Sequence, residues 1–309
     1  MSYGLNTSLT SCGVIFSLSY GVVLSAQLTL AKRLVVSNNF HPIQVAFFRC
    51  LIHLFCILLN GFGHQTDDFT VYDTILYFIC ALTGVLSWLF TAATFQDLES
   101  GDSTAIEIGA TVVFTTIMAH VYLSEYVDKF DVMLLLLDAT GIVLISKPSF
   151  LFGQSNQTQT SIKGVFLALI SALFCSMWLM FVKKLSVRKT LHFMLLNFIH
   201  GVVGIPVALL CSFVWGSWVA SPSWDSFALI LLFSFASLVQ TMVQATALNL
   251  EDAKTVAVSS TISTVLTYIV QLTVFKARFD WIVIVGALLV TLTVIFVQLK
   301  DIKERLFSQ

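Results

Sequence analysis

Long apolar stretches that contain no charged residue occur repeatedly along this chain. Two of the clearest are Ile75–Phe95 and Phe227–Leu248. A helix needs about 20 predominantly apolar residues to cross the hydrocarbon core of a bilayer, whereas the strands of a membrane barrel are shorter and alternate in polarity. Stretches of this length and continuity therefore predict transmembrane helices.

The composition supports the same class of protein. Hydrophobic residues make up 57% of the chain and charged residues 11%, with a mean hydropathy of +0.91, whereas soluble domains carry about 25% charged residues. These values exclude a single soluble core. The formal net charge is −1, and nucleic-acid binding requires a basic stripe, so we expect no nucleic-acid partner.

We expect an all-α polytopic membrane protein with ten transmembrane helices in the lipid bilayer. Asp138 falls inside the fifth and shortest segment, and a carboxylate that faces lipid costs about 2.5–3.5 kcal/mol. Its side chain is therefore expected among other helices or close to the interface. The expected segments are 12–31, 42–60, 73–95, 103–123, 131–146, 164–182, 190–214, 226–248, 255–275 and 280–299.

A polar stretch, Lys147–Lys163, divides the chain near its middle into two halves of five helices. An odd number of helices in each half places the second half upside down in the membrane relative to the first. We predict two inverted five-helix repeats, residues 12–150 and 164–299, joined by a polar linker at 151–163.

Internal similarity supports this division. A shift of 151 positions lays Lys32-Arg33-Leu34 on Lys183-Lys184-Leu185. A shift of 152 positions lays Leu98-Glu99 on Leu250-Glu251. Because the order of the matching residues is kept, a duplication explains them better than chance does.

The distribution of Lys and Arg predicts the orientation. The loops on the side of both termini carry nine of these residues and the opposite loops carry six, so both termini are expected to be cytoplasmic. The sequon Asn156-Gln157-Thr158 then faces away from the cytosol, and Asn6-Thr7-Ser8 faces it. Which of the two is glycosylated is left open by the sequence.

Arg49 is the most unusual residue, because it lies inside the second segment with no acidic residue in the same helix. Such a group needs a partner on another helix, a water-filled cavity or an anionic ligand. In a structural interpretation Arg49 pairs with Glu107 or Asp138, or binds carbonyl groups. In a functional one its planar fork binds a carboxylate or phosphate. His53 lies four residues further along, on the same helical face.

Glu107 begins a polar stripe on the fourth segment that continues with Thr111 and Thr115. Residues four apart share a helical face, so this stripe is expected to face the interior of the bundle. The favoured interpretation makes Glu107 the counter-ion of Arg49, and the alternative makes it a proton-coupling carboxylate.

Two helices of the second half carry further polar stripes with four-residue spacing. Stripes of this kind serve either close helix packing or the lining of a cavity, and both interpretations stay open. The stripes comprise Gln240 and Gln244 on the eighth segment and Ser259, Ser263, Thr267 and Gln271 on the ninth.

Motifs of catalysis and metal binding are absent from the sequence. It contains no G-x-S-x-G, H-E-x-x-H or Walker motif, and its six cysteines form no C-x-x-C pair. We therefore expect neither an enzyme nor a cofactor or metal site.

The pattern as a whole resembles the drug/metabolite transporter superfamily with EamA-type repeats, and is most similar to the G subfamily of solute carrier family 35. The resemblance rests on Phe47-Phe48-Arg49-Cys50 in the second segment, Leu123-Ser124-Glu125 after the fourth, and the Lys-Pro-x-Phe-Leu-Phe-Gly run that ends at Gly153. It implies a cavity between the repeats near mid-membrane, lined by helices 1–4 and 6–9. It also implies alternating access and the exchange of metabolites, among them organic anions, across the plasma membrane or the endoplasmic reticulum and Golgi membranes. Glu107 departs from the family, in which an apolar or hydroxyl residue is more usual there.

We therefore predict a secondary transporter or exchanger, or antiporter, of a small anionic metabolite. Arg49 is the expected anion anchor, and His53 and Glu107 are expected to tune charge or protonation beside it. The alternative is a membrane scaffold or regulator that transports nothing, and the sequence permits a homodimer. The other expected lining residues are Gln27, Trp178, Gln240, Gln244, Ser259 and Ser263.

Overall fold

In the computed structural model every regular element among the described residues is a helix, and no strand occurs there. It describes residues 2–60, 70–98, 100–146, 162–188, 191–215, 223–273 and 281–307. Most of the predicted linker at 151–163, including Asn156, lies outside these ranges. The helices are α1 (Ser2–Lys32) with its π-helical extension η1 (Arg33–Ser37), α2 (Pro42–Asn60), α3 (Val71–Asp97), α4 (Ser100–Leu123), α5 (Lys129–Ser146), α7 (Ile162–Val187), α8 (Phe193–Trp215), α9 (Trp224–Leu250), α10 (Ala253–Ser260), α11 (Ile262–Thr273) and α12 (Trp281–Phe307).

The expected apolar segments all coincide with helices, and the ninth coincides with the pair α10 and α11. Within the described residues, seven helices are long and apolar enough to cross a bilayer. The shorter apolar helices Pro42–Phe55 and Ile284–Lys300 lie within α2 and α12. The all-α class is confirmed, while the number of ten crossings stays a prediction.

Hydroxyl residues set the start of the third helix in each half. Thr70 caps α3 by accepting a hydrogen bond from the Asp73 backbone N–H, while the Asp73 side chain accepts one from the Thr70 backbone N–H. Ser223 caps α9 in the same way through the Ser226 backbone N–H. These side chains satisfy backbone donors that the first turn of a helix leaves unpaired.

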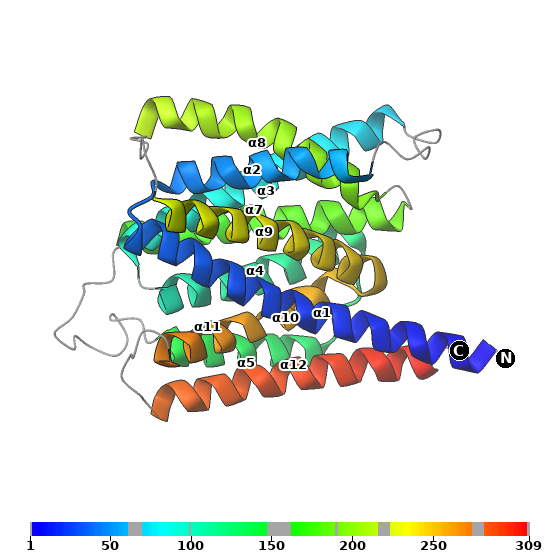
Figure 1. Cartoon of the computed structure of the whole chain (residues 1–309). Helices are drawn as coiled ribbons and strands as arrows, with labels where there is room; N and C mark the ends of the chain where they lie inside the picture. Colours follow the sequence, from blue (N-terminus) through cyan, green and yellow to red (C-terminus); the bar gives the residue numbers. More distant parts are fainter. Residues whose placement is uncertain are drawn as a thin grey trace.

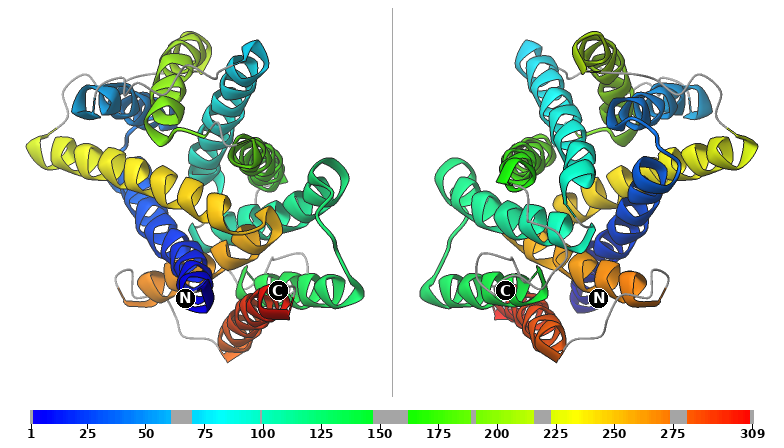
Figure 2. Two further views of the ribbon diagram at one scale, coloured as in Figure 1. Left: turned by 90° about the vertical axis from the view of Figure 1, so that its right-hand side faces the viewer. Right: turned by 90° about the vertical axis from the view of Figure 1, so that its left-hand side faces the viewer.

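Helices of the two halves interleave in one bundle (Figures 1 and 2). α3 packs along α7, and the equivalent pair with the halves exchanged, α9 and α1, packs in the same manner. α2 packs on its own equivalent α8 near one edge of the bundle, and α5 packs on its equivalent α12 near the opposite edge. Every major contact between the halves therefore has a counterpart when the halves are exchanged, as a two-fold relation requires.

Residue contacts give the direction of these helices. In the α2–α8 pair, a β-carbon added to Gly201 would lie 2.5 Å from the Leu54 backbone nitrogen, and one added to Gly204 would lie 2.3 Å from Cys50 Sγ. α2 and α8 are therefore antiparallel, because the later residue of α8 contacts the earlier residue of α2. α5 and α12 are likewise antiparallel, because Asp131 near the start of α5 pairs with Lys300 near the end of α12. In both of these pairs, equivalent helices of the two halves run in opposite directions.

The ninth segment is broken at Thr261, which corrects the expectation of one continuous helix. α10 ends at Ser260 and α11 begins at Ile262, and the Thr261 backbone N–H donates to the Val258 carbonyl at 3.0 Å. The Ser260 and Thr261 hydroxyls donate to carbonyls three residues earlier. Such local bonds compete with the helical ladder, which explains the break within this hydroxyl-rich run.

Ion pairs join α5 to α12 and α10 beyond the apolar core. Lys300 lies 2.8 Å from Asp128 and 2.5 Å from Asp131, and Lys254 lies 3.0 Å from Asp131. The hydrogen bond from Lys300 lowers the pKa of Asp128 from its ordinary value. These contacts fasten one end of the peripheral pair α5 and α12 to the rest of the bundle.

Candidate functional site

A small cavity lies between the two halves, about 60 Å³ in volume. The first half contributes Tyr20, Leu24, Leu28, Arg49, Gly84, Ser87, Trp88, Thr91, Glu107, Ile108 and Thr111, and the second half contributes Cys175, Trp178, His200, Gln240, Gln244 and Ser260.

Arg49 enters the cavity from α2 and is only 3% exposed. Its Nε donates a hydrogen bond to Ser237 Oγ on α9. Its guanidinium carbon lies 4.6 Å from the centroid of the Trp88 ring, in a cation–π contact. Its Nη1 has no hydrogen-bond partner among the described residues. One donor of the planar fork is therefore held in place and another is left for a ligand.

Two histidines lie beside Arg49, although only one lines the cavity. His53 Nε2 shares a hydrogen bond of 3.0 Å with Ser237 Oγ, the same hydroxyl that Arg49 binds. Its ring centroid lies 5.0 Å from that of His200. His200 lines the cavity against Trp178, with both ring nitrogens unpaired among the described residues. His53 thus positions the Ser237 hydroxyl, and His200 offers polar atoms to the cavity.

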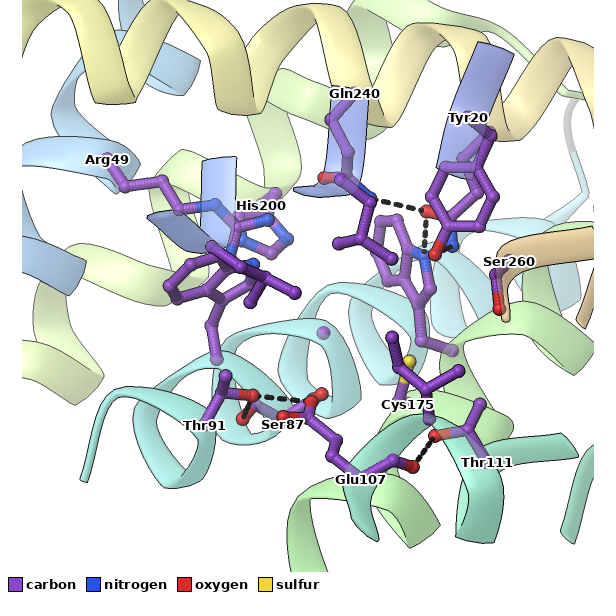
Figure 3. A pocket seen from close by; sticks show the side chains of 17 residues that line it. Tyr20, Arg49, Ser87, Thr91, Glu107, Thr111, Cys175, His200, Gln240 and Ser260 are labelled. Carbon is purple, nitrogen blue, oxygen red and sulfur yellow. Dashed lines mark hydrogen bonds between the residues drawn. The ribbon is translucent and has the colours of Figure 1, made fainter. Parts of the chain in front are cut away.

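Glu107 reaches the cavity from α4, on a different wall from Arg49 (Figure 3). Its Oε1 accepts hydrogen bonds from the Thr91 hydroxyl at 2.6 Å and the Ser171 hydroxyl at 2.9 Å. Its Oε2 has no partner among the described residues, and its side chain is 8% exposed. Hydroxyl groups solvate one oxygen of this carboxyl group and leave the other available.

The predicted pairing of Arg49 with Glu107 or Asp138 is wrong for the described part of the chain. No ion pair joins Arg49 to a carboxylate there, because Arg49 turns toward Ser237 on α9 while Glu107 turns toward Ser171 on α7. Asp138 is buried on α5 beside Thr261 and does not line the cavity. Two opposite charges therefore face one cavity without neutralising each other by direct contact.

Amide and aromatic side chains of the second half form the remaining polar wall. Trp178 Nε1 donates to Gln244 Oε1 at 2.9 Å, and Gln244 Nε2 donates to the Tyr20 hydroxyl at 2.8 Å. Gln240 Nε2 donates to the same Gln244 oxygen at 3.4 Å, which leaves its own Oε1 unpaired among the described residues. This network links α1, α7 and α9 across the halves.

The structure brings together five of the residues predicted for the site and places four outside the lining. Arg49, Glu107, Trp178, Gln240 and Gln244 line the cavity. Gln27 is buried elsewhere on α1, and His53 lies behind Ser237. Ser259 accepts a hydrogen bond from Gln298 on α12, and Ser263 donates to the Ser260 carbonyl. Ser260, the neighbour of Ser259 on α10, lines the cavity instead.

Tyr20, Ser87, Thr91, Cys175, His200 and Ser260 line the cavity without having been predicted. For two of them, His200 and Ser260, the alignment of the two halves of the sequence could have predicted the position. A shift of 151 lays Arg49 on His200, and a shift of 152 lays the cavity residue Ile108 on Ser260. A site on the two-fold axis is expected to use equivalent positions of both halves.

Comparison with known proteins agrees with the fold. The model of the EamA-like transporter family matches residues 11–147 and 162–299. Solute carrier family 35 member G1 of Mus musculus is 25% identical over 279 residues, which cover 88% of this chain and 75% of that protein. The same carrier of Homo sapiens is 25% identical over 287 residues, covering 90% and 76%.

A solved crystal structure shows the same fold at much lower sequence identity. It superposes with a TM-score of 0.69 at 11% identity, covering 89% of this chain and 96% of the other. At that identity the likeness concerns the fold alone.

Proposed function

Because the chain belongs to the EamA-like transporter family, we propose that it carries a small anionic metabolite across a membrane by alternating access. It is an integral, multi-pass membrane protein with two copies of the family's repeat. We propose ten transmembrane helices in two inverted repeats. The proposed location is the plasma membrane or the endoplasmic reticulum and Golgi membranes, with both termini in the cytosol.

The observation that carries this proposal is the state of Arg49. It lines a cavity between the halves, it has no carboxylate partner among the described residues, and its Nη1 is unpaired there. A buried guanidinium is costly to leave without an anion. A carboxylate or phosphate that accepts from its free donors supplies the missing charge.

The arrangement of the halves supports alternating access. Antiparallel equivalents surround the cavity, so tilting one half against the other opens it toward either side of the membrane in turn. The cavity volume of about 60 Å³ is small beside the roughly 300–1,000 Å³ of typical ligand pockets. Substrate entry then requires the walls to separate.

The alternative, a scaffold or regulator without transport, makes a different prediction about the same residue. It expects Arg49 to be satisfied by carboxylates of the chain itself, with no cavity beside it. Neither feature occurs among the described residues, and the transporter is therefore preferred.

Uptake into proteoliposomes tests the proposal. Purified protein is assayed with labelled pyruvate, succinate and UDP-glucose, comparing wild type with Arg49→Ala and Arg49→Lys. We expect uptake of an anion by wild type and a loss of about 10–100-fold in both variants, because charged hydrogen bonds contribute about 1.5–3 kcal/mol each. Lysine keeps the charge but not the fork.

Arg33→Ala is the matched control, because it removes the same charge from an exposed position after α1. Its uptake should equal that of wild type. Full activity of both Arg49 variants, correctly inserted and folded, would remove Arg49 from the anion role. Uptake of none of the three anions by wild type would remove the proposed function itself.

A further inference from the structure

The cavity contains two side chains of opposite formal charge that do not touch. Arg49 from α2 is bound to Ser237, and Glu107 from α4 is bound to Thr91 and Ser171. Among the described residues, no other Lys, Arg, Asp or Glu lines this space. The net charge of the cavity therefore depends on these two side chains and on the ligand that binds there.

Charge balance distinguishes the empty cavity from the loaded one. With a guanidinium and a carboxylate, the empty cavity is neutral. When a monovalent anion binds to Arg49, the same cavity carries an uncompensated negative charge, and charge away from water is strongly disfavoured. One positive charge that arrives with the anion restores neutrality.

The surroundings of Glu107 favour a proton as that positive charge. Hydroxyl groups of Thr91 and Ser171 contact Oε1, and Oε2 is free to bind hydrogen. A hard metal cation prefers several oxygen ligands with carboxylates among them, and Glu107 is the one carboxylate in the described lining. The other titratable groups that line the cavity are Tyr20 on α1, Cys175 on α7 and His200 on α8.

We propose that Glu107 binds one proton for each anion that Arg49 binds, which makes the protein a proton-coupled anion symporter. The inference rests on the proposed function and specifies its coupling ion. On the loading side a proton from water forms an O–H bond with Glu107 Oε2 as the anion binds. On the opposite side this bond breaks, the proton returns to water, and the anion leaves.

The test measures exchange and net uptake of the labelled monovalent anions pyruvate and lactate in proteoliposomes containing wild type, Glu107→Gln or Asp138→Asn. Asp138→Asn is the matched control, because Asp138 is likewise a buried carboxylate of the first half but lies outside the cavity lining. Exchange is measured at equal pH on both sides from pH 6 to 8.5, and net uptake with and without an inward proton gradient. Protein-free liposomes correct for permeation of the undissociated acid.

Wild type and Asp138→Asn should lose anion affinity as pH rises, by up to about tenfold per pH unit, because the proton and the anion bind cooperatively. An inward proton gradient should accelerate their net uptake. Glu107→Gln mimics the protonated group, so it should bind the anion more tightly at high pH, show no dependence on pH and gain nothing from the gradient.

Four results would overturn the coupling while leaving the transporter intact, and the first three concern the response to pH and to the gradient. They are wild-type exchange that does not depend on pH together with wild-type net uptake that does not depend on the gradient, persistence of the gradient effect in Glu107→Gln, and loss of that effect in Asp138→Asn as well. Glu107→Asp keeps a titratable group and should keep the gradient effect. If both Glu107 variants lose exchange, the carboxyl group serves binding rather than coupling, and the proposal is wrong. Absence of exchange in wild type would instead mean that the proposed function fails.

Discussion

The two halves of the molecule share a backbone plan but supply different chemistry to the cavity. At equivalent positions the first half has the guanidinium of Arg49 and the indole of Trp88, where the second half has the imidazole of His200 and the amide of Gln240. Both charged residues of the cavity lining among the described residues, Arg49 and Glu107, belong to the first half. The second half contributes neutral polar groups.

This difference shows that the two repeats keep equivalent positions facing the cavity but not the same side chains at those positions. Antiparallel packing around a two-fold axis preserves the positions that face the axis, because the helix contacts repeat when the halves are exchanged. The side chains at those positions are free to diverge. A bound anion is therefore expected to direct its charged group toward the first half and its neutral part toward Trp178 and the amides of Gln240 and Gln244.

The largest effect on anion uptake is expected from exchanging Arg49 and His200, which occupy equivalent positions of the two halves. Arg49→His should reduce anion uptake by about 10–100-fold, because it removes the fork and its charge-assisted hydrogen bonds. Adding His200→Arg should restore part of this loss by supplying the guanidinium from α8. Uptake by both variants and by His200→Arg alone measures the effect. If Arg49→His takes up the anion as fast as wild type, the charged group of the first half is not what binds the anion.

The next largest effect is a loss of stability, expected where the equivalent helices α2 and α8 pack with their backbones in close contact. An alanine at Gly201 places its β-carbon 2.5 Å from the Leu54 nitrogen and 2.7 Å from the Cys50 carbonyl oxygen, so α2 and α8 must separate. We expect Gly201→Ala to lower stability by about 1–3 kcal/mol, read as a lower midpoint of thermal unfolding in detergent.

Gly109→Ala is the control for this packing prediction. Its β-carbon would meet only the Ile142 side chain, at 3.1 Å, and a side chain can yield where backbone cannot. Equal losses for Gly109→Ala and Gly201→Ala would show that the α2–α8 contact is not tighter than an ordinary helix contact.

The smallest effect concerns Asp128, whose equivalent in the second half, Asp280, lies outside the described residues. Lys300 lowers the pKa of Asp128 in the folded chain, so its stabilising contribution is present above the unfolded pKa of about 3.9 and disappears as pH falls through the folded value. We expect Asp128→Asn to cost less than about 1 kcal/mol at pH 7, because the side chain is 31% exposed and screened by water.

Unfolding midpoints of wild type and Asp128→Asn at pH 7 and pH 3 check this prediction. The difference between them should shrink at pH 3, because the unfolded wild-type chain, in which the pKa of Asp128 is about 3.9, is mostly protonated there. A difference that grows toward acid pH would contradict the ion pair as its cause.

Sequence reasoning identified the helical class and several site residues because both depend on local composition. A long apolar segment becomes a helix in lipid wherever it stands, and Arg49 and Glu107 are conspicuous because charge is rare inside such segments. Gln27, Ser259 and Ser263 were expected to line the cavity and do not. Gln27 was expected because the shift of 151 lays it on Trp178, and Ser259 and Ser263 because of their four-residue spacing. Neither pattern fixes which face of a helix meets the cavity.

The partner that a buried charged side chain meets depends on how several helices are rotated about their axes and on how closely they pack. Glycines such as Gly201 let α2 and α8 approach closely, and the helices then meet with Arg49 beside Ser237 and Glu107 beside Ser171. The amino-acid sequence by itself determined that these charges lie inside an all-helical membrane protein, because hydropathy is additive along the chain. Only the tertiary structure decided that they face one cavity unpaired, because that depends on which helix faces pack together.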